Sequence, residues 1–170
     1  MDFAITGGAG FIGSHIAEQL VNSGHNVTII DNLSNGKKEN LNTIIDKIKF
    51  INGDIRDFNL LKNIFQNIDG VFHQAALASV QESFSKEQEY YDVNVKGTEN
   101  IFKLAKDLDF KVVYASSSSI YGNPEKIPIN ENDKKNPINP YAVTKLDDEN
   151  LAKKYAKMGV QIIGLRYFNV

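Results

Sequence analysis

The sequence contains no cysteine among its 170 residues. This absence excludes disulfide bonds, thiolate nucleophiles and cysteine metal sites, and it agrees with an intracellular enzyme. The three histidines, His15, His25 and His73, lie far apart and match no metal-ligand spacing. We interpret His73, at the end of a predicted strand, as a packed residue rather than a proton relay. The sequence therefore predicts a protein without a metal site.

Excess charge and long apolar runs are also lacking. The net charge is −2 and the pI about 5.9, so there is no basic surface of the kind that binds nucleic acid. No apolar run reaches the roughly 18 residues that a membrane-spanning helix needs. The N-terminal stretch has an acidic residue, Asp2, and is interrupted by glycines, unlike a signal peptide. These features predict a soluble, cytoplasmic protein that binds neither nucleic acid nor membrane.

Proline is confined to one stretch. All four prolines lie in "YGNPEKIPINENDKKNPINPYA", which covers residues 121–142. This stretch is long and polar, so it predicts a functional loop or lid rather than a linker between domains.

Short apolar segments alternate along the chain with segments of helical periodicity. Strands are predicted at Phe3–Thr6, Asn26–Ile30, Lys49–Ile51, Gly70–His73, Lys111–Ser116 and Gln161–Arg166. Helices are predicted from apolar spacing at Ile12, Ile16 and Leu20; at Leu61, Ile64, Phe65 and Ile68; at Val93, Ile101, Leu104, Ala105 and Leu108; and at Leu146, Leu151 and Tyr155. Apolar strands that alternate with helices indicate a parallel sheet covered on both faces. The predicted fold class is therefore α/β, a doubly wound parallel sheet of the Rossmann type, with one domain over residues 1–170.

A glycine-rich turn follows the first predicted strand. In "TGGAGFIGSH" glycines stand at positions 7, 8, 10 and 13, which fits the dinucleotide-binding fingerprint. One glycine permits the tight turn, another lets backbone N–H groups approach a pyrophosphate, and Gly13 lets helix and strand pack closely. A helix that begins near Phe11 then points its positive end at the phosphates. The turn predicts dinucleotide binding.

Two acidic residues follow later strands. Asp31 ends the second strand, where its carboxylate can accept both hydroxyls of the adenosine ribose and repel a 2′-phosphate, which favours NAD over NADP. In "GDIRD", Asp54 can bond to the adenine amino group, whereas Asp57 is as well explained as a cap of the next helix.

A candidate catalytic set lies in the second half of the chain. Tyr141 and Lys145 in "PYAVTK" are four residues apart, which places them on one face of a helix. An ammonium group near a phenol favours the phenolate, and the same ammonium can hold the ribose hydroxyls of a cofactor. The fifth strand runs into four serines in "YASSSSIYG" at the sheet edge where ligands bind. A serine hydroxyl there can bridge the substrate and the tyrosine.

These motifs together resemble a known family. "TGGAGFIGSH", "DNLSNG", "GDIRD", "HQAA", "YYDVNVKGT", "SSSSIYG", "PYAVTK" and "LRYFN" occur in this order over essentially the whole chain. They resemble the extended short-chain dehydrogenase/reductases, and among them the UDP-hexose 4-epimerases that use NAD.

The resemblance implies a catalytic set of Ser117, Tyr141 and Lys145. Tyr141 would take the proton of the sugar 4-hydroxyl while hydride passes from C4 to NAD, and the 4-keto sugar would then turn over and regain the hydride on its other face. Residues that match cofactor-contact positions of the family are Gly7, Gly10, Phe11, Ile12, Gly13, Asp31, Asn32, Asn35, Gly36, Asp54, Ile55, Ala75, Ala76, Asn94, Tyr141 and Lys145. Residues that match substrate positions are Ser79, Ser117, Ser118, Tyr141 and Asn169.

Comparison with the motifs of related families also indicates which reaction and which substrates to expect. Related 4,6-dehydratases and decarboxylases carry an acidic residue where this chain has Ser118 and Ser119, which argues against both. "HQAALASV" has Ala78 where epimerases strict for galactose have lysine, and it looks more like epimerases that accept UDP-N-acetylglucosamine, with or without UDP-glucose. UDP-glucuronate 4-epimerases share the serine run but tend to lack the proline at Pro140. Other sugar-nucleotide oxidoreductases of the family, such as its reductases, are a further alternative that fits the serine segment less well.

Family members are longer, and the resemblance implies that their C-terminal substrate lobe is absent from these 170 residues. We therefore expect this chain to bind NAD and to turn over sugar nucleotides poorly or not at all. The helices near 92–108 and 141–157 match those that pair in family homodimers. A different class of function, a catalytically silent NAD-binding sensor, is disfavoured because the serine, tyrosine and lysine are all present.

Overall fold

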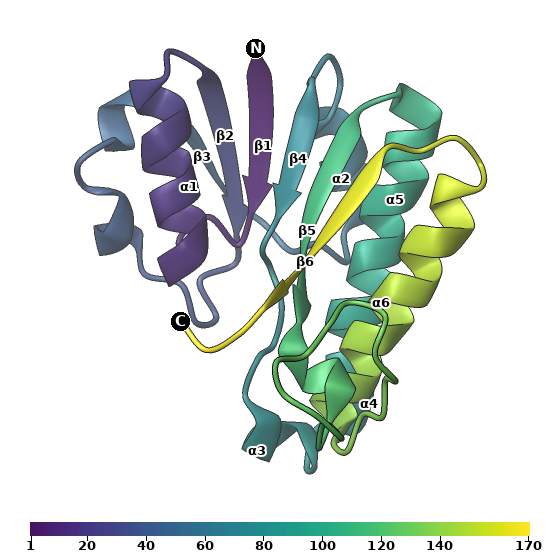
Figure 1. Cartoon of the computed structure of the whole chain (residues 1–170). Helices are drawn as coiled ribbons and strands as arrows, with labels where there is room; N and C mark the ends of the chain where they lie inside the picture. Colours follow the sequence, from purple (N-terminus) through teal and green to yellow (C-terminus); the bar gives the residue numbers. More distant parts are fainter.

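Six short apolar segments form one parallel sheet in the computed structural model, which describes residues 1–170 (Figure 1). The strand order is β3-β2-β1-β4-β5-β6. The strands are β1 (Asp2–Thr6), β2 (Asn26–Asp31), β3 (Ile48–Asn52), β4 (Gly70–His73), β5 (Lys111–Ser117) and β6 (Ile162–Tyr167). All neighbours are parallel, so every strand ends at the same edge of the sheet. The doubly wound fold predicted from the sequence is confirmed.

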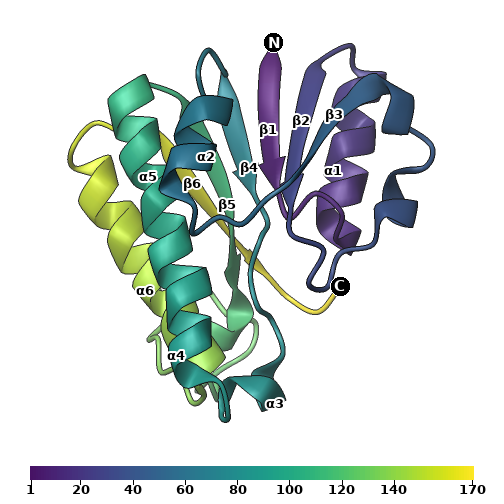
Figure 2. The same ribbon diagram turned by 180° about the vertical axis from the view of Figure 1, so that it is seen from behind.

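The helices cover both faces of this sheet. Helix α1 lies on one face, and α2, α5 and α6 lie on the other (Figures 1 and 2). The main helices are α1 (Phe11–Asn22), α2 (Phe58–Ile64), α5 (Gly97–Leu108) and α6 (Pro140–Ala156). The shorter elements are α3 (Val80–Ser83), α4 (Glu87–Tyr90), a π-helical turn (Tyr91–Lys96) and 3₁₀ turns at Lys38–Leu41, Ile45–Lys47 and Ser118–Tyr121.

Two apolar cores follow from the alternation of side chains along the strands. On β1, Ile5 packs into the core under α1, while its neighbour Ala4 packs into the larger core on the other face. Ile29 and Ile30 of β2 divide in the same way. Because a register shift of one residue would exchange the two faces, this alternation fixes how the strands pair.

The predicted strands all exist, with ends that differ by one residue in most cases. Two helix predictions need correction. Helix α2 ends at Ile64, and Ile68 lies beyond it because the chain turns at Asn67, whose φ is +64°. Val93 belongs to the π-helical turn, not to a regular helix. This turn contains Asn94, a fully buried residue whose amide bonds to the backbone of Leu77, and such wide turns often accommodate a local constraint of this kind.

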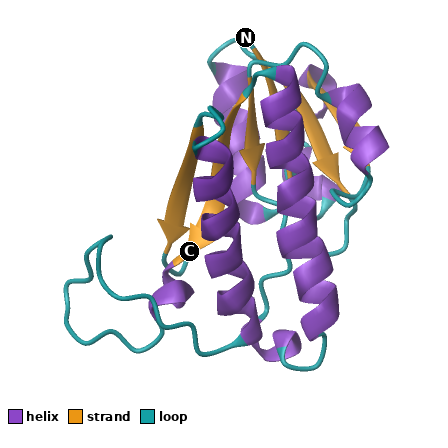
Figure 3. Cartoon of the chain, turned by 90° about the vertical axis from the view of Figure 1, so that its right-hand side faces the viewer, coloured by secondary structure: helices purple, strands orange, loops and turns teal.

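The proline-containing stretch is a loop, as predicted, and Figure 3 shows it extending from one end of the layers. It ends where Asn139 caps α6 by accepting a hydrogen bond from the Ala142 N–H, and Pro140 occupies the first turn of the helix. No helix of the structure has both the length and the apolar character required to cross a bilayer.

A charged cluster ties this loop to the sheet. Glu149 of α6 accepts hydrogen bonds from Ser116 at 2.9 Å and from Arg166 of β6 at 2.7 and 3.0 Å, and it pairs with Lys135 at 3.0 Å. Arg166 also donates to the Tyr121 hydroxyl and to a loop carbonyl. Burial alone would raise the pKa of Glu149, but the bonds from Arg166, Lys135 and Ser116 lower it to about 2.

The lowered pKa predicts how stability depends on pH. The carboxylate of Glu149 stabilises the fold above the ordinary glutamate pKa of 4.5, and this contribution is lost as the pH falls towards 2. Glu149→Gln should therefore lower the free energy of unfolding at pH 7 by about 1.5–3 kcal/mol. The difference from the unmutated chain should shrink between pH 4.5 and 2. Thermal unfolding followed by circular dichroism measures both, and Glu125→Gln, at an exposed position, is the control.

Candidate functional site

Two adjoining hollows lie at the edge where the strands end. The acidic hollow, of about 380 Å³, is lined by residues that include Asp31, Asn32, Asn35, Gly36, Asp54, Ile55 and Ala75. The serine hollow, of about 790 Å³, is lined by residues that include Ile12, Gly13, Ser116, Ser117, Ser118, Ser119, Tyr141, Lys145 and Asn169. Five residues line both hollows: Gly7, Gly10, Phe11, Gln74 and Ala76. The structure thus gathers most of the predicted site residues in one continuous depression.

The glycine turn is shaped by close backbone approaches. Gly7 has φ +70°, and a Cβ there would stand 2.5 Å from the Ala75 nitrogen. A Cβ on Gly13 would stand 2.8 Å from the Gly8 Cα and overlap the Gly7 carbonyl oxygen. Gly10 precedes α1 directly, and its side chain position is open apart from the Gly7 oxygen at 3.2 Å. The first turn of α1 is therefore accessible to a phosphate, and the residues present fit a dinucleotide.

Asp31 has a second role that the motif did not reveal. It is buried, and its carboxylate accepts hydrogen bonds from the Ala9 N–H at 2.9 Å and the Leu33 N–H at 2.8 Å. The first bond fixes the glycine turn and the second fixes the loop after β2. A carboxylate has about four acceptor positions, so Asp31 can still bind ribose hydroxyls.

Asp54 also has protein partners. Its carboxylate accepts hydrogen bonds from the Arg56 guanidinium at 2.6 and 2.9 Å and from the Asn32 amide at 3.1 Å. The bonds from Arg56 are the main cause that lowers the pKa of Asp54 to about 2. Asp54 remains at the rim of the acidic hollow, and its contact with adenine stays a prediction. Asp57 caps α2 by accepting a bond from the Leu60 N–H.

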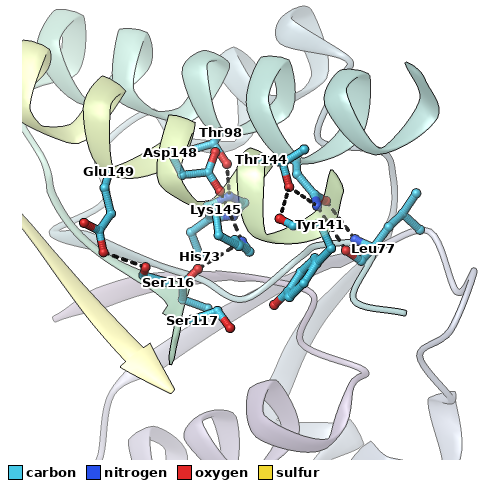
Figure 4. A network of polar contacts seen from close by, with 12 residues as sticks. His73, Leu77, Thr98, Ser116, Ser117, Tyr141, Thr144, Lys145, Asp148 and Glu149 are labelled. Atoms are coloured by element: carbon cyan, nitrogen blue, oxygen red, sulfur yellow. Dashed lines mark hydrogen bonds and ion pairs between the residues drawn. The ribbon is translucent and has the colours of Figure 1, made fainter. Parts of the chain in front are cut away.

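Helix α6 and the end of β5 place the predicted catalytic residues together. Ser117 is the last residue of β5, and Tyr141 lies in the first turn of α6. Both residues line the serine hollow. Figure 4 shows the phenol of Tyr141 on the same side of Lys145 as Ser117. The Ser117 Oγ accepts hydrogen bonds from the backbone N–H and the hydroxyl of Ser119 at 3.1 and 2.8 Å. This contact orients the Ser117 hydroxyl.

Lys145 is held in place by two acceptors. Its Nζ donates to the Ala115 carbonyl at 3.0 Å. It also donates to the Asp148 carboxylate at 3.1 Å, and Figure 4 shows the two side chains together. Both side chains are almost completely buried. Burial raises the pKa of Asp148 to about 6, against the opposing pull of the Lys145 ammonium. An ammonium has three N–H donors, so one remains for a ligand in the serine hollow.

His73 is a packed residue, as predicted. One ring nitrogen lies 2.6 Å from the Thr6 hydroxyl and the other 2.8 Å from the Thr98 hydroxyl. Burial, with a smaller contribution from the Lys145 charge, lowers the pKa of His73 to about 3. The imidazole is therefore neutral at pH 7 and joins β1, β4 and α5.

Two predicted residues lie outside both hollows. Asn94 is fully buried, where its amide bonds to the backbone of Leu77 and to the Thr144 hydroxyl at 3.0 Å. Ser79 is exposed and caps α3, although its neighbours Ala78 and Val80 line the serine hollow. Their ligand contacts stay predictions.

Sequence reasoning missed two residues of this region. Asp148 lies three residues after Lys145 in "KLDD", a spacing that places both on one helix face. This spacing could have predicted the ion pair between them. Gln74 follows β4 and lines both hollows. Its position, as a polar residue directly after a central strand, could have indicated a place at the ligand-binding edge of the sheet.

The comparison with protein families agrees with this geometry. The model of the NAD dependent epimerase/dehydratase family matches residues 3–170. The chain belongs to this family.

Similar proteins cover the chain almost completely. It is 42% identical over 173 residues to a UDP-glucose 4-epimerase of Halalkalibacterium halodurans, which covers 99% of this chain and 51% of that protein. A solved UDP-N-acetylglucosamine 4-epimerase of Methanobrevibacter ruminantium M1 is 39% identical with a TM-score of 0.94, over 99% of this chain and 55% of that one. The dTDP-glucose 4,6-dehydratase DesIV of Streptomyces venezuelae, solved with NAD, is 30% identical with a TM-score of 0.93, over 98% and 55%. The chain thus spans about half the length of these relatives.

The crowding at Gly13 predicts a severe effect of a single methyl group. Gly13→Ala should lower the free energy of unfolding by about 1–3 kcal/mol or more, because the new Cβ overlaps the Gly7 oxygen. Gly10→Ala is the matched control, since its Cβ would meet only the Gly7 oxygen at 3.2 Å and should cost less. Urea unfolding of both variants measures the difference, and equal costs would contradict the assigned role of Gly13.

Proposed function

We propose that this chain is the NAD-binding, proton-transferring half of an enzyme that interconverts UDP-hexoses at C4. The observation that carries the proposal is the meeting of Ser117, Tyr141 and Lys145 in one hollow that adjoins the glycine turn. The family supports NAD as the cofactor, and the similar epimerases support a UDP-sugar as the substrate.

The two hollows divide the cofactor between them in this proposal. The acidic hollow would take the adenosine half, with its ribose hydroxyls on Asp31. The serine hollow would take the nicotinamide half, with its ribose on the free N–H of Lys145. NAD, when bound, supplies the hydride acceptor that makes oxidation at a sugar carbon reversible.

The chain's own residues carry the proton. Tyr141 Oη is the group that takes the proton of the sugar 4-hydroxyl, and the buried ammonium of Lys145 lies one turn further along the same face of α6. Ser117 Oγ, oriented by Ser119, would bond to the same sugar oxygen and hold it beside Tyr141. Asp148 keeps the Lys145 ammonium in position by a 3.1 Å contact.

A dehydratase reaction needs a group that this part of the site does not offer. Eliminating water beside a 4-keto group requires a general acid. No aspartate or glutamate lines the serine hollow, and the positions after Ser117 are two more serines. This lining favours epimerisation over the reaction of the dehydratase relative.

UDP-glucose and UDP-N-acetylglucosamine remain the proposed substrates, with UDP-glucuronate as the alternative. Homodimerisation through α5 and α6 is part of the same proposal.

The proposal predicts the effect of removing one oxygen atom. In the full-length protein, Tyr141→Phe should reduce the rate of epimerisation about 10²- to 10⁴-fold, because the proton acceptor is lost. The measurement is the turnover rate of each variant with UDP-glucose, UDP-N-acetylglucosamine and UDP-glucuronate. The absorbance of the reduced cofactor is recorded with each of the three sugars, and the rates rank them as substrates. Tyr91→Phe, at an exposed tyrosine, is the control and should keep full activity.

Full activity of Tyr141→Phe would refute the proton-transfer role. If the unmutated protein bound NAD but no nucleotide sugar reduced it, a sensor would replace the enzyme as the proposed function.

A further inference from the structure

Gln74 has a buried amide without a partner. Both polar atoms of the side chain, Nε2 and Oε1, are shielded from solvent, and neither makes a hydrogen bond within the protein. Burial raises the pKa of Tyr167, and an interaction of its hydroxyl with the Gln74 side chain opposes this shift, but the contact falls outside hydrogen-bond geometry. A buried amide that lacks partners destabilises a protein, because it has lost its bonds to water. Such a group therefore requires a functional explanation.

The position of Gln74 supplies that explanation. Among the five residues that line both hollows, the other four are Gly7, Gly10, Phe11 and Ala76. Gln74 is thus the only one of the five whose side chain carries hydrogen-bonding atoms. A ligand that occupied both hollows would therefore lie next to Gln74.

The backbone of Gln74 is fixed and close to the glycine turn. Its N–H donates to the Thr6 carbonyl at 2.9 Å, which extends the pairing of β1 with β4 by one residue. A Cβ on Gly7 would stand 2.8 Å from the carbonyl carbon of Gln74. The two backbone segments are therefore so close that only glycine fits at position 7. The backbone of Gln74, from which the side chain starts, is therefore held beside the glycine turn.

We propose that Gln74 is a cofactor-binding residue whose amide hydrogen-bonds to the middle of a bound dinucleotide, at the pyrophosphate and the ribose that follows it. This inference rests on the proposed binding of NAD in the two hollows. The amide matches that region chemically, because Nε2 can donate to a phosphate oxygen while Oε1 accepts from a ribose hydroxyl. Binding would thus satisfy two buried atoms that the free protein leaves unpaired.

The proposal predicts opposite effects of Gln74→Leu on stability and on binding. The leucine removes an unpaired amide, so the ligand-free chain should unfold at the same or a higher temperature. Its affinity for NAD and for ADP-ribose should fall about five- to tenfold, as expected for the loss of hydrogen bonds. Its affinity for AMP should not change, because AMP lacks the second phosphate and the second ribose. Calorimetric titration of the chain with the three ligands measures these affinities.

Further variants separate direct contact from indirect effects. Gln161→Leu, at an exposed glutamine, should change neither stability nor affinity. Gln74→Glu should weaken NAD binding more than the leucine does, and added salt should reduce this excess, because a carboxylate would face the pyrophosphate.

Three results would overturn the assignment of Gln74: an unchanged NAD affinity in Gln74→Leu, an equal loss for AMP and NAD, or a clear loss of stability, which would reveal a structural partner for the amide. Each of these requires that the unmutated chain binds NAD. If the unmutated chain bound neither NAD nor ADP-ribose, the proposed function itself would fail, and the role of Gln74 with it.

Discussion

Strands β1 and β4 run side by side at the centre of the sheet, and the position of every candidate site residue depends on this pairing. The chain leaves β1 towards α1 on one face, whereas the chain after β4 leads to α5 on the other. A crevice opens where the two connections diverge, as in other doubly wound sheets. His73 fastens the pair by contacting the hydroxyls of Thr6 and Thr98. The glycine turn and Gln74 therefore face each other across the junction of the two hollows.

Buried charge is arranged around this crevice so that each group is held before any ligand arrives. Lys145 lies between a carbonyl and the Asp148 carboxylate, Asp31 accepts two backbone N–H bonds, and Glu149 binds Arg166. Such contacts reduce the reorganisation that ligand binding and proton transfer require. Gln74 is the exception, because both polar atoms of its amide are unpaired, whereas Asp148 leaves only Oδ1 without a partner and binds Lys145 through Oδ2. A site with fixed charges and one unsatisfied donor–acceptor pair is consistent with a function in binding rather than in stability.

The parts of this structure that depend on local sequence could be predicted. Strand positions followed from apolar segments, and the glycine turn and the shared helix face of Tyr141 and Lys145 followed from fixed spacings. Interactions between distant residues could not be predicted in the same way. The family resemblance places Asn94 at a cofactor-contact position, which stays a prediction, but no spacing indicated that its amide bonds to Thr144, fifty positions later, or that the chain forms a π-helical turn there. The unpaired state of Gln74 depends on what surrounds it in space, which no spacing along the chain encodes.

The central claim is that the carboxyl edge of this sheet binds NAD, with Asp31 at the adenosine ribose. Titration of the chain with NAD and with NADP, under identical conditions, tests it most directly. We expect measurable binding of NAD and at least about tenfold weaker binding of NADP, because the buried Asp31 carboxylate would repel a 2′-phosphate. Absence of NAD binding, or equal affinity for the two cofactors, would contradict it.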